Sequence, residues 1–240
     1  MNDLLKLAVS AHGGLSRWDQ LGMLEAKMSI TGALWHKKGK PDVLKKTCME
    51  AQLHEERVIT HLIGQNKRMV FTPNRVATET EDGLVLKSRD NPRAAFEHHR
   101  AETPWDDLHV AYFNNYALWT YLTIPFLYTY PGFVTEELAP WREDGEEWRP
   151  LNVTFPDYIA THTREQISYF GKDGLLRRHE YTVDILGGAQ GVNYAADYRN
   201  VDGIMIPAKR RIYPCDAERR KVAEPILVAI VIGEIGFSAR

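Results

Sequence analysis

The chain has 240 residues, a length that suits a single domain with a sizeable core. Its 30 Lys and Arg residues nearly balance its 32 Asp and Glu residues, so no overall field draws it to nucleic acid or to an anionic membrane. The first residues lack the basic leader and long apolar run of a signal peptide, and Cys48 and Cys215 lack Cys-x-x-Cys spacing. We therefore expect a cytoplasmic protein with reduced thiols and no nucleic-acid partner.

Residues 1–22 have the pattern of two short helices. Apolar side chains recur at helical spacing from Leu4 to Val9, and His12-Gly13-Gly14 supplies a glycine that can take the positive φ at a helix end. A second turn, Ser16–Leu21, stops at Gly22. We expect these helices to precede the main fold.

Residues 24–90 change to the pattern of a β-meander. Short apolar or alternating runs are separated by Gly, Pro and Asn, which is typical of strands joined by turns. The expected strands are Ala26–Leu34, Leu44–Leu53, Arg57–Ile63, Arg68–Thr72 and Leu84–Lys87.

Residues 91–130 predict a helical insert with one main helix, Pro104–Thr123. Thr103 is a good N-cap, proline suits the first helical position, and Asp106-Asp107 places negative charge in the first turn. Pro125 disfavours helical geometry in the residue before it and should end the helix. Apolar residues occupy both sides of this helix, so we expect it to be buried on both sides. The helix is also too short, and too often interrupted by polar residues, to span a membrane.

Residues 150–237 have the pattern of antiparallel hairpins. Asp173-Gly174 and Asp202-Gly203 separate extended runs, as Asp82-Gly83 does upstream, and Asp-Gly suits a type I′ turn because both residues tolerate positive φ. The last apolar run, Ile226–Ile232, predicts a strand buried on both faces. We expect the acidic segment Trp141–Trp148 to be a loop.

The one compact basic cluster is Lys209-Arg210-Arg211. On a strand, these side chains point alternately to two faces, so the patch on either face is smaller than the run suggests. We interpret the cluster as a solvated strand edge.

Together these elements predict an α+β fold in one domain, residues 1–240, in which a curved antiparallel β-sheet (a half-barrel) wraps around the helical insert. The order of elements, ending in the strand-turn-strand stretch Val201–Pro207 with its Ile-x-Ile-Pro sequence, resembles the bacterial lipoprotein carriers and receptors LolA and LolB. It is also similar to the VioE-like enzymes of the violacein pathway, which share that half-barrel. The resemblance implies an apolar cavity between sheet and helices. The lipoprotein carriers are exported, whereas this chain shows no export signal, so we expect the cavity and not lipoprotein transport.

The hairpin Ile159–Asp184 carries the densest group of polar side chains. Antiparallel pairing through a loop with an even number of residues places six side chains on one face: His162, Arg164, Gln166, His179, Tyr181 and Val183. A loop of odd length would separate them. The two histidines could exchange protons, and the tyrosine and arginine could stabilise an oxyanion. The alternative is an ordinary polar outer face, since half-buried sheets have one polar and one apolar side.

Ring side chains gather on the predicted helix. The candidate ligand-binding residues there are Trp105, Tyr112, Asn115, Tyr116 and Trp119. Flat apolar surface with a few hydroxyls suits an aromatic or lipid-like molecule. The amide of Asn115 lies within an apolar stripe and needs a partner, which could be a ligand, a backbone group or a buried water. The alternative is that these side chains are simply core.

The sequence lacks the spacings that indicate a metal, a catalytic nucleophile or a nucleotide cofactor. Adjacent histidines such as His98-His99 diverge by about 100° on a helix, and no His-x-x-x-His or His-Glu-x-x-His occurs. There is no Gly-x-Ser-x-Gly, P-loop or Gly-x-Gly-x-x-Gly pattern. We expect no metal and no cofactor.

Three functional hypotheses follow. The first is a cytoplasmic protein that binds a hydrophobic small molecule, aromatic or acyl-chain, between its sheet and the helix Pro104–Thr123. The second, implied by the VioE-like resemblance, is a cofactor-independent enzyme in which His162, Arg164, His179 and Tyr181 supply acid–base and anion-stabilising groups. The third is a homo-oligomeric interaction protein whose apolar surface is covered by another subunit.

Overall fold

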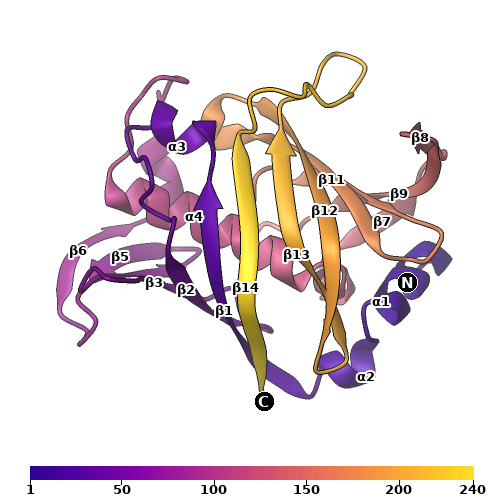
Figure 1. Ribbon diagram of the computed structural model, residues 1–240, viewed down its shortest axis with the longest axis horizontal. Coiled ribbons are helices and arrows are strands. Elements are labelled where there is room, and N and C mark those ends of the chain that lie inside the picture. The colour runs from indigo at the N-terminus through magenta and orange to yellow at the C-terminus, as the bar shows by residue number, and fades with distance from the viewer.

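A computed structural model describes all 240 residues and consists of one large antiparallel sheet with four α-helices (Figure 1). The strand order is β6-β5-β4-β3-β2-β1-β14-β13-β12-β11-β10-β9-β7, and β8 pairs with β9. Because the first strand pairs with the last, the N-terminal meander and the C-terminal hairpins join into one open sheet with edges at β6 and β7. The predicted α+β fold with a curved antiparallel sheet in a single domain is confirmed.

The N-terminal half of the sheet is an up-and-down meander, as predicted. Its strands are β1 (Leu21–Thr31), β2 (Thr47–Gln52), β3 (Val58–Leu62), β4 (Arg68–Thr72), β5 (Arg75–Glu79) and β6 (Val85–Asp90). Strand β5 was not predicted; it follows β4 after only two residues. The first strand is shorter than predicted, because residues 33–37 form the short helix α3 (Ala33–Lys37), whose first two N–H groups bond to the segment before β14.

The C-terminal half is a series of hairpins. Its strands are β7 (Val134–Glu137), β8 (Trp141–Glu143), β9 (Glu146–Thr154), β10 (Glu165–Phe170), β11 (Leu176–Val183), β12 (Ala189–Val201), β13 (Ile204–Tyr213) and β14 (Val228–Ala239). Two expectations were wrong. Residues 141–148 form a hairpin and not a loop, because Asp144-Gly145 takes the positive φ values of a type I′ turn. The last strand is buried on one face only, since Val231 is 47% exposed between two buried isoleucines.

The three Asp-Gly turns differ in geometry. Asp202-Gly203 has φ values of 52° and 90° and joins the opposed residues Val201 and Ile204, as a type I′ turn should. At Asp82-Gly83 and Asp173-Gly174 only the glycine has positive φ, and each hairpin has a register shift nearby. All three sites are hairpins as predicted, but only one has the predicted turn type.

The helices are α1 (Asp3–Ala11), α2 (Leu15–Trp18), α3 and α4 (Asp107–Thr123), with 3-10 turns at Pro92–Phe96, Phe126–Thr129 and Asp184–Leu186. The N-cap of α4 is Asp106 and not Thr103. The Asp106 carboxylate accepts from the backbone N–H of His109 at 2.8 Å, and the His109 ring accepts in return from the Asp106 N–H at 3.1 Å. Thr103 lies four residues before the first helical residue, and its hydroxyl accepts instead from the backbone N–H of Arg100.

Helix α4 forms the centre of the core. Every residue from Leu108 to Thr123 is buried, as the apolar character of both its sides predicted. One side packs on β3, β4 and β5, and in Figure 1 the helix crosses behind β1, β14 and β13. None of the helices combines the length and the apolar character needed to cross a membrane.

Candidate ligand-binding cavity

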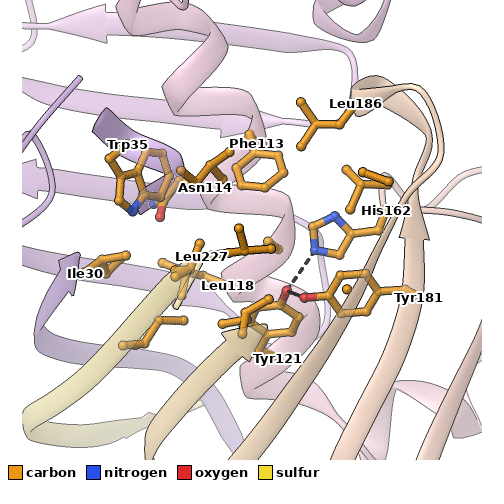
Figure 2. A pocket seen from close by; sticks show the side chains of 18 of the residues that line it. Ile30, Trp35, Phe113, Asn114, Leu118, Tyr121, His162, Tyr181, Leu186 and Leu227 are labelled. Carbon is orange, nitrogen blue, oxygen red and sulfur yellow. Dashed lines mark hydrogen bonds between the residues drawn. The ribbon is translucent and has the colours of Figure 1, made fainter. Parts of the chain in front are cut away.

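An apolar cavity of about 70 Å³ lies between α4 and the strands β11 to β14 (Figure 2). Fifteen of its nineteen lining residues are hydrophobic. Leu34, Leu186 and Leu227 line it and are only partly buried, so they form its outer rim. The sheet and the helix therefore enclose a chamber, and that chamber lies on the side of α4 away from β3–β5.

The local structure explains which residues face the cavity. Phe113, Ala117 and Tyr121 are four residues apart and so form one stripe along α4. On the strands, alternate residues point inward, which brings Tyr181 and Val183 of β11 to the cavity wall.

A buried hydrogen-bonded chain forms part of this wall. The His162 ring lies between two phenols: its Nδ1 is 2.9 Å from the hydroxyl of Tyr116, and its Nε2 is 2.8 Å from the hydroxyl of Tyr121. The hydroxyl of Tyr121 also bonds to that of Tyr181, whose ring stacks on His162 at 4.1 Å (Figure 2). Four side chains from three separate segments thus form one chain.

The hydrogen-bonded chain Tyr116–His162–Tyr121–Tyr181 has one donor proton more than it has hydrogen bonds. Neutral His162 supplies one N–H, and Tyr116, Tyr121 and Tyr181 supply one O–H each, which makes four donors for three bonds. In either tautomer of the ring, an O–H remains at one end of the chain. When the spare donor belongs to Tyr181, it is available to a polar atom in the cavity.

Burial keeps these groups neutral. It lowers the pKa of His162 to about 3 and that of His179 well below its ordinary value. It raises the pKa values of Tyr116, Tyr121 and Tyr181. No group of three or more His, Cys, Asp or Glu side chains is arranged to hold a metal ion. The site can therefore stack on a ligand and hydrogen-bond to it, but its histidines are poorly suited to exchange protons near neutral pH.

Three of the four predicted catalytic residues lie together. His179 is fully buried with its ring 5.1 Å from that of Tyr181, which in turn stacks on His162. Ser168 lies opposite His179, so the predicted parity of the hairpin holds. Arg164 does not join them: β10 begins one residue later, and the Arg164 side chain is 63% exposed and paired with Asp157 at 2.8 Å.

The buried guanidinium of this region is Arg210, which is 3% exposed. The structure thus differs from the solvated strand edge expected for residues 209–211, because β13 lies inside the sheet between β12 and β14. Ile206, Ala208 and Ile212 share the parity of Arg210 and are also buried. That alternation was visible in the sequence and could have identified Arg210 as an inward-facing residue.

None of the five predicted ligand-binding residues, Trp105, Tyr112, Asn115, Tyr116 and Trp119, lines the cavity. Asn115 Oδ1 accepts from the Thr60 hydroxyl of β3 at 2.7 Å, and Trp119 Nε1 donates to the Gln52 carbonyl at 2.7 Å. Tyr116 reaches the site indirectly, through its bond to His162. The amide oxygen of Asn115 is therefore paired within the protein, whereas its Nδ2 has no partner.

Comparison with known proteins supports the fold. No family model matches the chain, and no curated protein matches it. A solved DUF1329 family protein from Desulfovibrio piger is 11% identical with a TM-score of 0.53, covering 98% of this chain and 91% of its own. A LolA superfamily protein from Nitrosomonas europaea is 9% identical with a TM-score of 0.52, and the match covers 98% of this chain and 92% of that protein. A provisionally named outer membrane lipoprotein-sorting domain from Vibrio parahaemolyticus is 9% identical with a TM-score of 0.54, and the match covers 97% of this chain and 91% of that domain. The chain therefore has a LolA-like fold, as predicted.

Proposed function

We propose that the protein binds a hydrophobic small molecule, aromatic or acyl-chain, in the cavity between α4 and β11–β14. The observation that carries this proposal is a hydrophobic chamber bordered by the hydrogen-bonded hydroxyl groups of Tyr121 and Tyr181. The Vibrio parahaemolyticus domain of the same fold is named for the sorting of lipoproteins, which supports a lipid-like ligand here.

The size of the cavity limits the ligand. Ligand pockets for drug-sized molecules typically measure roughly 300–1,000 Å³, whereas this one measures about 70 Å³. A short apolar group fits the cavity as it stands, and a longer ligand requires the rim to widen. The rim residues lie outside the long strands: Leu34 is in the short helix α3, Leu186 is in the 3-10 turn after β11, and Leu227 directly precedes β14. Short elements and loops between strands are freer to move than the strands they connect.

The other hypotheses receive less support. An acid–base enzyme at this site needs groups that titrate near neutral pH, and burial holds His162 and His179 neutral. The homo-oligomer remains a hypothesis that size-exclusion measurements can test. We keep the cytoplasmic location as part of the proposal, with cell fractionation as its test.

Thermal unfolding with a panel of fluorescent fatty acids and indoles tests ligand binding. A ligand at about 100 times its Kd stabilises the folded state by about 2.7 kcal/mol, which for a chain of this size raises the melting temperature by roughly 5–10 °C. The variant Ala117→Leu places extra volume in the cavity and should abolish this shift. The control Ala196→Leu, at an exposed position on β12 outside the cavity, should keep it.

Two results would contradict the proposal. One is a panel in which no compound shifts the melting temperature of the wild-type protein. The other is a shift that persists unchanged in Ala117→Leu, since the ligand would then bind elsewhere.

A further inference from the structure

A group of polar side chains is buried next to the cavity, on the face of the sheet that meets α4. His179, Asn193 and Arg210 come from the neighbouring strands β11, β12 and β13 and are 0%, 0% and 3% exposed. Asn193 lies opposite His179, and Arg210 lies opposite Ala195, two residues further along β12. Because directly opposed residues project to the same side of a sheet, the three side chains share one face.

Most polar atoms of this group lack a hydrogen-bond partner. Both ring nitrogens of His179, both amide atoms of the Asn193 side chain, and Nε and Nη1 of Arg210 are buried and unpaired. Buried polar atoms in folded proteins nearly always have partners, because an unpaired donor or acceptor has lost its hydration without compensation. Their concentration on one face indicates a site for a polar group that the chain does not itself supply.

Arg210 is a buried cation without a counter-charge. Its Nη2 donates to the Tyr121 carbonyl at 2.6 Å, and its guanidinium lies 5.2 Å from the centre of the Tyr121 ring, but it forms no ion pair with a carboxylate. The surrounding phenols of Tyr128, Tyr181 and Tyr198 do not supply the charge, because burial raises their pKa values and keeps them protonated. Since arginine remains charged in proteins, an anion would complete the site.

We propose that His179, Asn193 and Arg210 bind the carboxylate of an amphipathic ligand whose apolar part occupies the cavity. The group is rich in donors: Nε and Nη1 of Arg210 carry three N–H groups, the Asn193 amide carries two, and the neutral His179 ring carries one. A carboxylate only accepts hydrogen bonds and pairs strongly with a guanidinium. This inference rests on the proposed function and narrows the ligand to an aliphatic or aromatic monocarboxylic acid.

Two residues connect the polar group to the cavity. Tyr121 and Ile212 both line the cavity. The Tyr121 ring lies 6.0 Å from the His179 ring as well as against Arg210, and Ile212 lies opposite Asn193 on β13. An acid that lies along the Tyr121 ring would place its apolar end in the cavity and its carboxylate at the buried guanidinium.

Calorimetric titration with matched acids and alcohols tests this subsite. The probes are octanoate with octanol, and 3-phenylpropionate with 3-phenylpropanol, at pH 7. Wild-type protein should bind each acid at least about 10-fold more tightly than its alcohol. Arg210→Met should remove this preference and leave alcohol binding unchanged. The control Arg211→Met, at the exposed neighbouring position on β13, should preserve the preference.

A second variant supplies the counter-charge from within the chain. Asn193→Asp places a carboxylate beside Arg210, so it should raise the melting temperature without ligand, weaken acid binding at least about 10-fold and retain alcohol binding. The control Asn200→Asp, at an exposed position of the same strand, should neither raise the melting temperature nor weaken acid binding. This variant keeps the inference testable if Arg210→Met fails to fold.

The outcomes separate the two proposals. Equal affinity of wild-type protein for acid and alcohol, or unchanged acid affinity in Arg210→Met and Asn193→Asp, would overturn the carboxylate subsite while the apolar cavity stands. Failure of every acid and every alcohol to bind would overturn the cavity proposal and the subsite with it.

Discussion

The two sides of α4 are equally buried but differ in how their polar groups are paired. On the side that faces β3–β5, Asn115 and Trp119 bond to Thr60 and Gln52, and neither residue lines the cavity. On the other side, Tyr121 faces the cavity and lies against Arg210, whose guanidinium has no counter-charge. Asn115 Nδ2 is also unpaired, but it is a single atom, whereas six unpaired atoms belong to His179, Asn193 and Arg210. Ring density therefore does not identify the binding side, and our proposal rests on this concentration of unpaired polar atoms.

The largest expected effect concerns acid pH. Burial lowers the pKa of His12 to about 4, that of His162 to about 3 and that of His179 well below its ordinary value, while an unfolded histidine has a pKa of about 6.5. Below pH 6.5 the unfolded chain therefore takes up protons that the folded chain does not, and stability is lost as pH falls. Between pH 7 and pH 5 the three histidines should lower the free energy of unfolding by about 5 kcal/mol.

Denaturant unfolding of two histidine variants isolates this effect. Glu56 acts in the opposite direction, because burial raises its pKa, so the difference between variants is more informative than the wild-type curve. His179→Gln should reduce the loss between pH 7 and pH 5 by about 2 kcal/mol. His98→Gln, at a side chain that is 90% exposed, should leave it unchanged. The same pH dependence in both variants would show that His179 is not held neutral.

Truncation of two adjacent residues of α4 compares its sides directly. Trp119→Ala should destabilise the protein by roughly 3–5 kcal/mol without changing the affinity of any cavity probe. Leu118→Ala should cost roughly 2–5 kcal/mol but enlarge the cavity, and so strengthen the binding of the larger aromatic probes. Denaturant unfolding and fluorescence titration measure the two quantities. Weaker probe binding in Trp119→Ala with no change in Leu118→Ala would reverse the assignment of the two sides.

A smaller effect is expected from two asparagines. Asn115→Leu should cost about 1–3 kcal/mol, because the buried Thr60 hydroxyl loses its acceptor. Asn193→Leu should leave stability unchanged or raise it slightly, because its amide has no partner to lose. Equal losses in the two variants, measured by urea unfolding, would mean that Asn193 is paired after all.

Most of the fold could be predicted from local pattern. Alternating apolar residues and Asp-Gly turns identified the strands and hairpins, and Pro125 marked the end of α4. The N-cap could not be predicted correctly, because Thr103 and Asp106 are both good caps and the local pattern does not distinguish between them.

The candidate site was only partly predictable. Hairpin parity predicted that His162, His179 and Tyr181 share a face, and the three lie together, although His162 precedes the first residue of β10. It could not show which side of α4 faces a cavity, because both sides are apolar and tertiary packing sets the rotation of the helix. The inward position of Arg210 was not predicted, because a run of three basic residues is typical of a solvated edge, whereas the alternation of β13 places the middle one on the buried face.

The most direct test is a crystal structure of the protein with the tightest-binding compound of the fatty-acid and indole panel. We predict that the apolar part of the compound lies between Phe113, Ala117 and Tyr121 of α4 and the inward side chains of β11–β14. A compound bound instead on the other side of the helix, against Tyr112 and Trp119, or on the outer face of the sheet, would contradict it.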